Sequence, residues 1–169
     1  MRLFIAINFS DEIKAAVAEV RDSLKALALR GNFSFDEHLH LTLLFLGECD
    51  VPQVETIKRV IDNTLFPNFT LMLDKAGHFK RDSGNTWWIG IKENQALSDL
   101  QADLSVRLGQ KGFALENRKY TPHVTIGREV IMPVGFDKPK VRQVGFDVGS
   151  IELMKSERIN GKLIYTSIL

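Results

Sequence analysis

Two short segments that favour β-structure, HLTLLFLG at residues 40–47 and HVTIG at residues 123–127, repeat the pattern histidine, apolar, threonine, apolar. Because successive side chains of a strand point to opposite faces, His40 and Thr42 share one face of their strand, and His123 and Thr125 share one face of theirs. The apolar residues between them point the other way and can pack beneath helices. The two motifs lie 83 positions apart in a chain of 169 residues. This spacing predicts a weak internal duplication with two related lobes that face each other.

Three amphipathic stretches predict helices between the strands. Ser10 can cap the first helix, and Gly31 is expected to end it. Pro52 suits the first turn of the second helix, which is expected to run to Pro67. The third helix is expected over residues 94–112. Apolar residues recur at helical spacing along each of them: Ile13, Val17, Val20, Leu24 and Leu27; Val54, Ile57, Ile61 and Leu65; Leu97, Leu100, Leu104 and Leu108.

The remaining segments read as strands and set the fold class. They cover residues 2–9, 32–35, 39–47, 69–79, 86–92, 123–130, 141–155 and 162–169. Helices alternate with pairs of strands, which favours an α+β fold with antiparallel sheets over a doubly wound parallel sheet. No linker rich in Ser, Gly or Pro divides the chain. We therefore expect residues 1–169 to form a single bilobal domain of two pseudo-symmetric lobes, with helices on the outer faces and both His-x-Thr strands central, at one cleft.

Charge and cysteine content limit the partners and the compartment. The net charge of +1 provides no bulk basic field for long nucleic acid, so a polyanion would have to bind at a local site. Cys49 is the only cysteine, which excludes an intrachain disulfide and a cysteine metal cluster and fits a reducing compartment. No apolar run approaches the ~20 residues of a membrane span, and the N-terminal segment lacks the features of a signal peptide. We expect a cytoplasmic monomer that contacts no membrane.

The two motifs together suit acid–base chemistry at phosphorus. Histidine has an unperturbed pKa of roughly 6.5, so a pair can hold one neutral imidazole as general base and one protonated imidazole as general acid. Threonine hydroxyls can donate hydrogen bonds to anionic oxygens. His40, His123, Thr42 and Thr125 therefore suit an in-line displacement at phosphorus that needs neither a nucleophilic side chain nor a metal or other cofactor. Such a pair predicts a bell-shaped pH profile near neutrality.

Other readings of these residues were weighed against that chemistry. A single His-x-Thr is common on surface strands, whereas two copies in matching contexts point to function. His38 and His40 could be paired metal ligands, but the acidic residues around them form no recognisable metal motif, so we expect no metal. His78 could face the cleft or cap a turn. Of the neighbouring residues Trp87 and Trp88, at most one can face the cleft, because neighbours in a strand point to opposite sides.

At the level of whole segments, the chain resembles the two-histidine phosphoesterases, specifically the RNA 2′,3′-cyclic phosphodiesterases long called 2′-5′ RNA ligases. The resemblance covers nearly the whole chain. It lies in RLFIAINF, HLTLLFLGE, AGHFKR followed by TWWIGI, YTPHVTIGR, and the closing IELMKSERINGKLIYTSIL. It implies a bilobal α+β fold with pseudo-twofold symmetry and a central cleft. It also implies metal-independent opening of a ribose 2′,3′-cyclic phosphate to a 2′-phosphate, with RNA ends or nucleotides as substrates and 2′-5′ ligation as the reverse reaction.

The resemblance also implies a role for each residue of the motifs. His40 would donate a proton and His123 would accept one, while Thr42 and Thr125 would bind phosphate oxygens. Arg128 is out of phase with His123 in a regular strand, so it would bind phosphate only if the strand ends or bulges at Gly127. Two alternatives stay open: a related enzyme acting on a small cyclic nucleotide or sugar phosphate, and a non-catalytic module that binds RNA ends.

Overall fold

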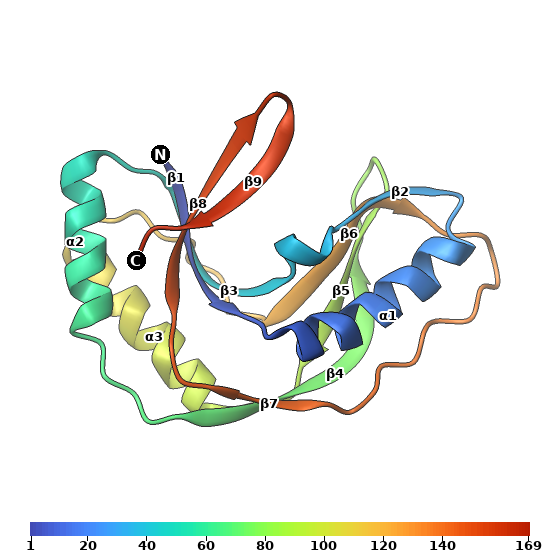
Figure 1. The fold of residues 1–169 in the computed structure, drawn as a ribbon, viewed down its shortest axis with the longest axis horizontal. Helices are drawn as coiled ribbons and strands as arrows, with labels where there is room; N and C mark the ends of the chain where they lie inside the picture. The colour runs from blue at the N-terminus through green and yellow to red at the C-terminus, as the bar shows by residue number, and fades with distance from the viewer.

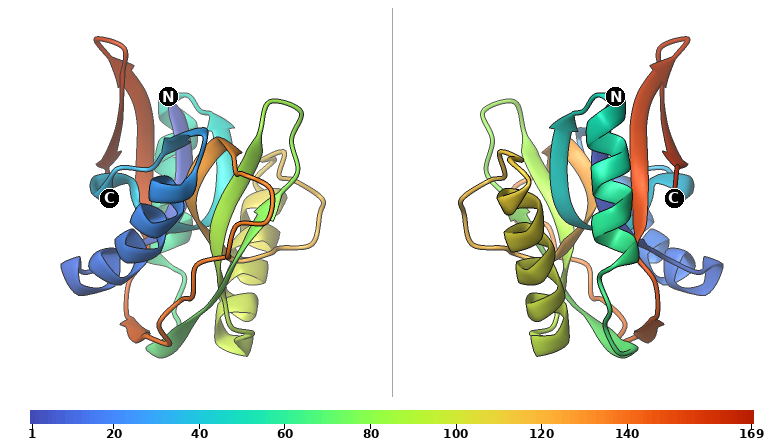
Figure 2. Two further views of the ribbon diagram at one scale, coloured as in Figure 1. Left: turned by 90° about the vertical axis from the view of Figure 1, so that its right-hand side faces the viewer. Right: turned by 90° about the vertical axis from the view of Figure 1, so that its left-hand side faces the viewer.

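The computed structural model describes residues 1–169 and contains two antiparallel sheets (Figure 1). The four-stranded sheet has the order β3 (His40–Glu48), β1 (Arg2–Asn8), β8 (Glu152–Ile159), β9 (Lys162–Ser167). The five-stranded sheet has the order β2 (Arg30–Phe33), β6 (His123–Ile131), β5 (Asn85–Ile91), β4 (Phe69–Phe79), β7 (Gly145–Val148). The α+β prediction with two lobes of antiparallel sheet is confirmed. The β8–β9 hairpin extends beyond the body of the sheets (Figure 2).

Three helices lie beside the sheets, and each begins at a side-chain cap. Ser10 accepts a hydrogen bond from Ile13 N at the start of α1 (Asp11–Leu27), and Asn94 caps α3 (Gln95–Gln110). Asp50 and Gln53 form a reciprocal capping box at α2 (Val51–Asp62). Although α1 follows β1 of the four-stranded sheet, it packs near β2 and β6 of the other sheet. Conversely, α3 follows β5 and packs near α2 and β3 (Figure 1). The chain therefore crosses between the lobes repeatedly.

The first helix is shorter than the sequence predicts. It ends at Leu27 rather than at Gly31, because Leu29 N already donates to the carbonyl of Ile131 and starts the strand pairing of β2. Gly31 instead lies within β2, where an added Cβ would come 2.9 Å from the side chain of Val130. The glycine therefore serves a close approach of two strands rather than a helix end.

Two further segments differ from their predicted lengths. The second helix ends at Asp62 rather than at Pro67, and Leu65, which the predicted apolar stripe included, is 91% exposed. Residues 141–155 do not form one strand. They divide into β7 and β8, which belong to different sheets, so this segment carries the chain from one lobe to the other.

The two His-x-Thr strands occupy different places in their sheets. β6 lies inside the five-stranded sheet, but β3 is the outer strand of the four-stranded sheet, so the prediction that both are central is wrong for β3. The free side of β3 is turned toward β6, and Cα atoms of the two strands approach within 8 Å. Pairing β3 on one side only leaves its other backbone edge available to the opposite lobe.

One hydrophobic core joins both lobes. It comprises 36 buried residues drawn from both sheets and all three helices. A separate small cluster of Phe4, Ala6 and Met154 lies on the other face of the four-stranded sheet and packs against Tyr165. No helix has the length and apolar composition that a membrane crossing requires.

Candidate active site

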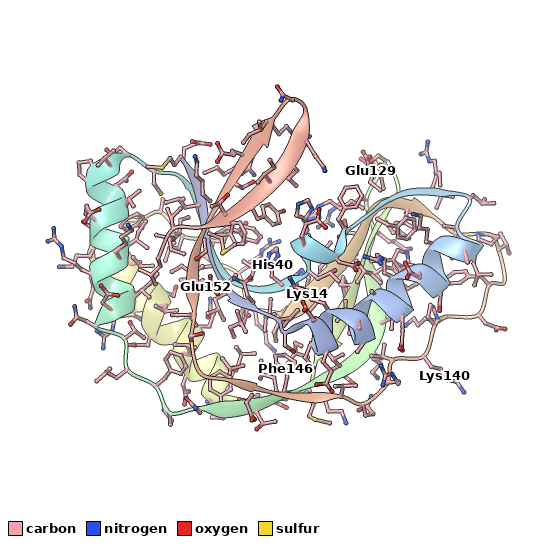
Figure 3. All side chains as sticks on the ribbon, in the orientation of Figure 1. Lys14, His40, Glu129, Lys140, Phe146 and Glu152 are labelled. Carbon is pink, nitrogen blue, oxygen red and sulfur yellow. The ribbon has the colours of Figure 1, made fainter.

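The two histidines begin their strands at the place where the lobes meet. His40 is the first residue of β3, and His123 is the first residue of β6. His40 points into the space between the lobes (Figure 3). The charges of His123 and Arg128 both lower the pKa of His40, as expected of groups on the neighbouring strands β3 and β6. The structure therefore places the two strands that carry the predicted site residues next to each other.

Both imidazoles are held by the same local hydrogen bond. His40 Nδ1 lies 2.7 Å from the carbonyl oxygen of His38, and His123 Nδ1 lies 2.6 Å from the carbonyl oxygen of Thr121. A carbonyl oxygen can only accept, so Nδ1 of each ring must carry the proton. In a neutral ring this leaves Nε2 as the atom with the free lone pair. Each motif thus presents Nε2, in a fixed tautomer, as its reactive nitrogen.

The two Nε2 atoms have different surroundings. His40 Nε2 lies 2.9 Å from Thr42 Oγ1, so the hydroxyl and the ring nitrogen of the first motif are hydrogen-bonded to each other. His123 Nε2 has no such partner in Thr125, although the spacing in the sequence is the same. The structure is therefore asymmetric at the atoms that would exchange protons, even though the two motifs have the same pattern.

Burial lowers the pKa of both histidines. Desolvation is the largest cause and brings the pKa of His40 from 6.5 to about 4. The hydrogen bond to His38 opposes this effect, whereas the charges of Arg128, His38 and His123 add to it. Burial likewise lowers the pKa of His123, and Arg128 contributes there too. Both rings are therefore mainly neutral at pH 7 in the free protein.

A β-bulge follows each motif at the same position. In β3, Ile5 and Ala6 of β1 pair with Leu44 and Thr42, so Leu43 is skipped. In β6, Trp87 and Trp88 of β5 pair with Gly127 and Thr125, so Ile126 is skipped in the same way. The fourth residue of each motif is the extra one, which shifts the side-chain alternation that follows.

The bulge in β6 accounts for the position of Arg128. A regular strand would place Arg128 on the face opposite to His123, but the skipped Ile126 reverses the alternation. The exposed Arg128 lowers the pKa of both His40 and His123 through its charge, as expected of a side chain beside both rings. The sequence predicted that Arg128 could share the side of His123 only if the strand ended or bulged at Gly127, and β6 has such a bulge immediately before Gly127.

Aromatic side chains flank each histidine. Next to His40, the rings of Phe4 and Tyr165 have centroids at 4.9 and 5.4 Å from the imidazole centroid. Next to His123, the corresponding distances are 5.2 Å for Phe79 and 6.3 Å for Trp88. These walls exclude water from the imidazoles and explain their desolvation.

Of the two neighbouring tryptophans, only Trp88 lies on the histidine side. Its indole lies over Gly77 of β4, where any Cβ would come 2.3 Å from the ring, so a glycine is needed there. Trp87 is 1% exposed and belongs to the core, as the alternation of a strand requires. His78 packs against Trp87, with ring centroids 4.8 Å apart, and therefore lies on the face away from His123.

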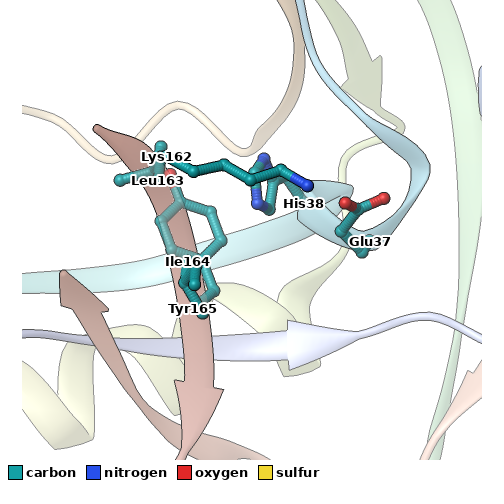
Figure 4. Close-up of a pocket in the computed structure, with 6 residues that line it drawn as sticks. All are labelled: Glu37, His38, Lys162, Leu163, Ile164 and Tyr165. Carbon is teal, nitrogen blue, oxygen red and sulfur yellow. The ribbon is translucent and has the colours of Figure 1, made fainter. Parts of the chain in front are cut away.

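His38 contributes its backbone to the site and its ring to a neighbouring cavity. It ends the short 3-10 helix η1 (Asp36–His38), and its imidazole lies 4.7 Å from the ring of Tyr165. The cavity, of about 240 Å³, lies between η1 and β9 (Figure 4). It is lined by Glu37, His38, Lys162, Leu163, Ile164 and Tyr165. No three His, Cys, Asp or Glu side chains are grouped here or elsewhere in a way that could hold a metal ion.

A family model described as the 2′-5′ RNA ligase superfamily matches residues 9–160. The chain belongs to this superfamily. A relative in Thermotoga maritima, named RNA 2′,3′-cyclic phosphodiesterase, is 33% identical over 141 residues, which are 82% of this chain and 75% of the relative. A relative of the same name in Escherichia coli K12 is 28% identical over 168 residues, or 99% of this chain and 93% of the relative.

Solved structures of the superfamily share the fold. The crystal structure of E. coli LigT complexed with 3′-AMP superposes with a TM-score of 0.87 at 28% identity, and the match covers 99% of this chain and 95% of that one. A match of this extent includes both lobes and both His-x-Thr strands. The predicted family is therefore confirmed.

Several residues of this superfamily member lie at the site but were not predicted from its sequence. Tyr165 and Phe79 come from β9 and β4, far from either motif in the chain. Tyr120 and Ser34 make hydrogen bonds to the backbone of the two motifs. The only sequence signal was the position of Tyr120, three residues before His123. For the others the contact depends on the packing of distant strands, which periodicity does not encode.

Proposed function

We propose that this protein is an RNA 2′,3′-cyclic phosphodiesterase, which hydrolyses a ribose 2′,3′-cyclic phosphate to a 2′-phosphate by paired-histidine acid–base catalysis without a metal. The observation that carries the proposal is that two imidazoles, each fixed through Nδ1 by a carbonyl oxygen two residues upstream, begin the neighbouring strands β3 and β6. The relatives named RNA 2′,3′-cyclic phosphodiesterase support it. Residues 1–169 would form one bilobal domain, and 2′-5′ ligation would be the reverse reaction.

We assign His123 as the base, because its Nε2 has no protein partner, and His40 as the acid, because a bound phosphate anion would favour its protonated form against the burial that lowers its pKa. A water molecule attacks phosphorus and passes its proton to Nε2 of His123, which has no protein partner. The bond from phosphorus to the 3′ oxygen breaks, and the leaving oxygen takes the proton from Nε2 of His40. The 2′-phosphate stays on the ribose, the base has gained one proton and the acid has lost one, so the reaction balances.

The phosphate oxygens would be bound by two hydroxyls and one guanidinium. Thr42 and Thr125 share the faces of their histidines. Thr125 can donate a hydrogen bond to developing negative charge, and Thr42, whose hydroxyl donates to Nε2 of neutral His40, can do so once His40 is protonated. Arg128 forms none of the ion pairs of the structure, so its charge is available to an anion. A bound phosphate would also offset the repulsion that Arg128 exerts on protonated histidines.

Three substrates, tested with EDTA present, separate this function from its alternatives. They are 2′,3′-cyclic AMP, an RNA oligomer with a 2′,3′-cyclic phosphate end, and a 2′-5′-linked dinucleotide. Phosphorus NMR should show a 2′-phosphate as the product of the first two. Turnover of the mononucleotide without turnover of the RNA end would favour the small-substrate alternative. Tight binding of the RNA end without any turnover would favour a binding module and contradict the proposal.

A further inference from the structure

Each His-x-Thr motif is hydrogen-bonded by a hydroxyl from the segment that leads into the other motif. Tyr120 donates its hydroxyl proton to the carbonyl oxygen of Thr42 at 2.8 Å. Ser34 donates its hydroxyl proton to the carbonyl oxygen of Thr125 at 3.1 Å. Tyr120 lies three residues before His123, and Ser34 lies six residues before His40. The two contacts are reciprocal in the sequence, but only that of Tyr120 joins the lobes, because Ser34 follows β2 and Thr125 lies in β6 of the same five-stranded sheet.

The bulges explain why these carbonyl groups are free to accept a side chain. A bulge removes one residue from the regular ladder, and the backbone groups around it need other partners. In β3 the carbonyl oxygen of the skipped Leu43 accepts from Gln101 Nε2 of α3 at 3.5 Å. In β6 the carbonyl oxygen of the skipped Ile126 accepts from Ser34 N at 2.9 Å. The bulge of β3 is thus held by a helix residue from outside its sheet, whereas the bulge of β6 is held by Ser34, which directly follows the neighbouring strand β2.

The hydroxyl of Tyr120 is well suited to a permanent contact of this kind. Burial raises its pKa, so it stays protonated and remains a donor throughout the range in which the histidines titrate. Its ring also packs against the hydrophobic core. Replacement by phenylalanine would keep that packing and remove only the hydrogen bond, which makes the contribution of the hydroxyl measurable by itself.

We propose that Tyr120 and Ser34 are positioning residues: Tyr120 sets the separation of His40 and His123 across the two lobes, and Ser34 fixes the bulged strand that carries His123. The proposal rests on the proposed function, since it concerns the same two histidines. An in-line displacement needs base, phosphorus and acid in one line, and a misplacement of about 1 Å can cost ~10²-fold in rate. We call these two contacts braces: the brace of Tyr120 acts where the lobes could otherwise shift, and the brace of Ser34 acts on the bulge beside Thr125.

The test compares Tyr120→Phe and Ser34→Ala with Thr64→Val as a matched control. Thr64 also donates a buried hydroxyl to a carbonyl, that of Val60 at 2.7 Å, but it follows α2, a helix at the left side of the molecule in Figure 1, away from β3 and β6. Each brace variant should lower kcat for 2′,3′-cyclic AMP by ~10-fold with little change in KM, as expected for a partial misplacement. In the double variant, kcat should fall by more than the product of the two single fold-losses. Ser34→Thr, which keeps the hydroxyl that Ser34→Ala removes, should retain the wild-type kcat. Thr64→Val should lower the melting temperature at least as much and keep kcat.

A second readout needs no substrate and separates this proposal from the proposed function. In Tyr120→Phe, proton NMR titration should show the pKa of His40 moving up toward 6.5, because a looser contact between the lobes admits water; in Ser34→Ala the titration of His123 should change instead. Arg128, His38 and His123, whose charges face His40, are unchanged in these variants. Wild-type kcat in both brace variants, or an equal loss of kcat in Thr64→Val, would overturn the proposal. If the wild type hydrolyses no cyclic phosphate, the proposed function fails. The positioning role is still tested by NMR in that case, and unchanged histidine titrations in both variants would overturn it.

Discussion

The pH dependence of turnover gives the sharpest test of the paired-histidine mechanism. Only the pair with one neutral and one protonated imidazole is productive, so kcat/KM should follow a bell-shaped curve. This ratio reports the free protein, in which burial lowers the pKa of His40 to about 4 and lowers that of His123 from 6.5 as well. We therefore expect the maximum of kcat/KM on the acidic side of neutrality, with the two limbs reporting the pair rather than either residue.

Bound substrate should move this curve upward. The fall in the pKa of His40 from 6.5 to about 4 corresponds to roughly 3 kcal/mol against protonation. A phosphate anion about 4 Å from the ring contributes roughly 4 kcal/mol in its favour at an effective dielectric constant of about 20. The two effects are of similar size and opposite sign. The bell-shaped curve of kcat, which reports the complex, should therefore lie at least ~1 pH unit above that of kcat/KM.

The assay measures initial rates with 2′,3′-cyclic AMP from pH 4 to pH 9 at constant ionic strength, alongside NMR titration of the histidines. His78→Gln serves as the control, because His78 packs against Trp87 on the other face of its sheet, and it should reproduce both wild-type curves. Coincident curves for kcat and kcat/KM, or a His40 pKa at or above 6.5 in the free protein, would refute the reasoning.

Four further outcomes are expected. His40→Ala and His123→Ala should each lower kcat/KM by at least ~10²-fold and each remove one limb of the bell-shaped curve, as measured by the same initial rates across the pH range. Thr42→Ala and Thr125→Ala should lower kcat/KM by ~10–10³-fold, and unchanged rates in both would place the hydroxyls elsewhere. Activity should persist in EDTA, and loss that zinc or manganese restores would contradict a metal-free mechanism. The free energy of unfolding should fall as the pH is lowered from 6.5 to about 4, because His40 takes up its proton in the unfolded chain before it does so in the folded protein. Urea titrations should show that this fall is smaller by roughly 3 kcal/mol in His40→Ala.

The membership of the superfamily and the identity of the four motif residues follow from local sequence. The period of two in a strand makes His40 and Thr42 share a face whatever surrounds them. The helices α1, α2 and α3 were likewise predicted from local apolar stripes, and the prediction was wrong mainly at the helix ends. Leu65 has the right spacing for the stripe of α2 but is exposed, because the helix ends before it.

The strand boundaries show where local pattern stops being informative. Residues 141–155 are rich in β-forming residues throughout, yet the chain leaves one sheet and enters the other within this segment. Which sheet a strand joins depends on which edge is free, and this is a property of the assembled lobes. The position of β3 at the edge of its sheet, facing β6, has the same origin.

The sequence by itself determined which groups the two motifs present: two histidines and two threonines, paired by strand periodicity and repeated in each half. Only the tertiary structure decided how those groups behave. The bulge that brings Arg128 to the histidine side, the aromatic walls that lower the pKa of His40 and the reciprocal bonds of Tyr120 and Ser34 all join residues far apart in the chain. The physical reason is that register shifts, desolvation and hydrogen bonds between lobes arise from packing, whereas the motif arises from the geometry of a single strand.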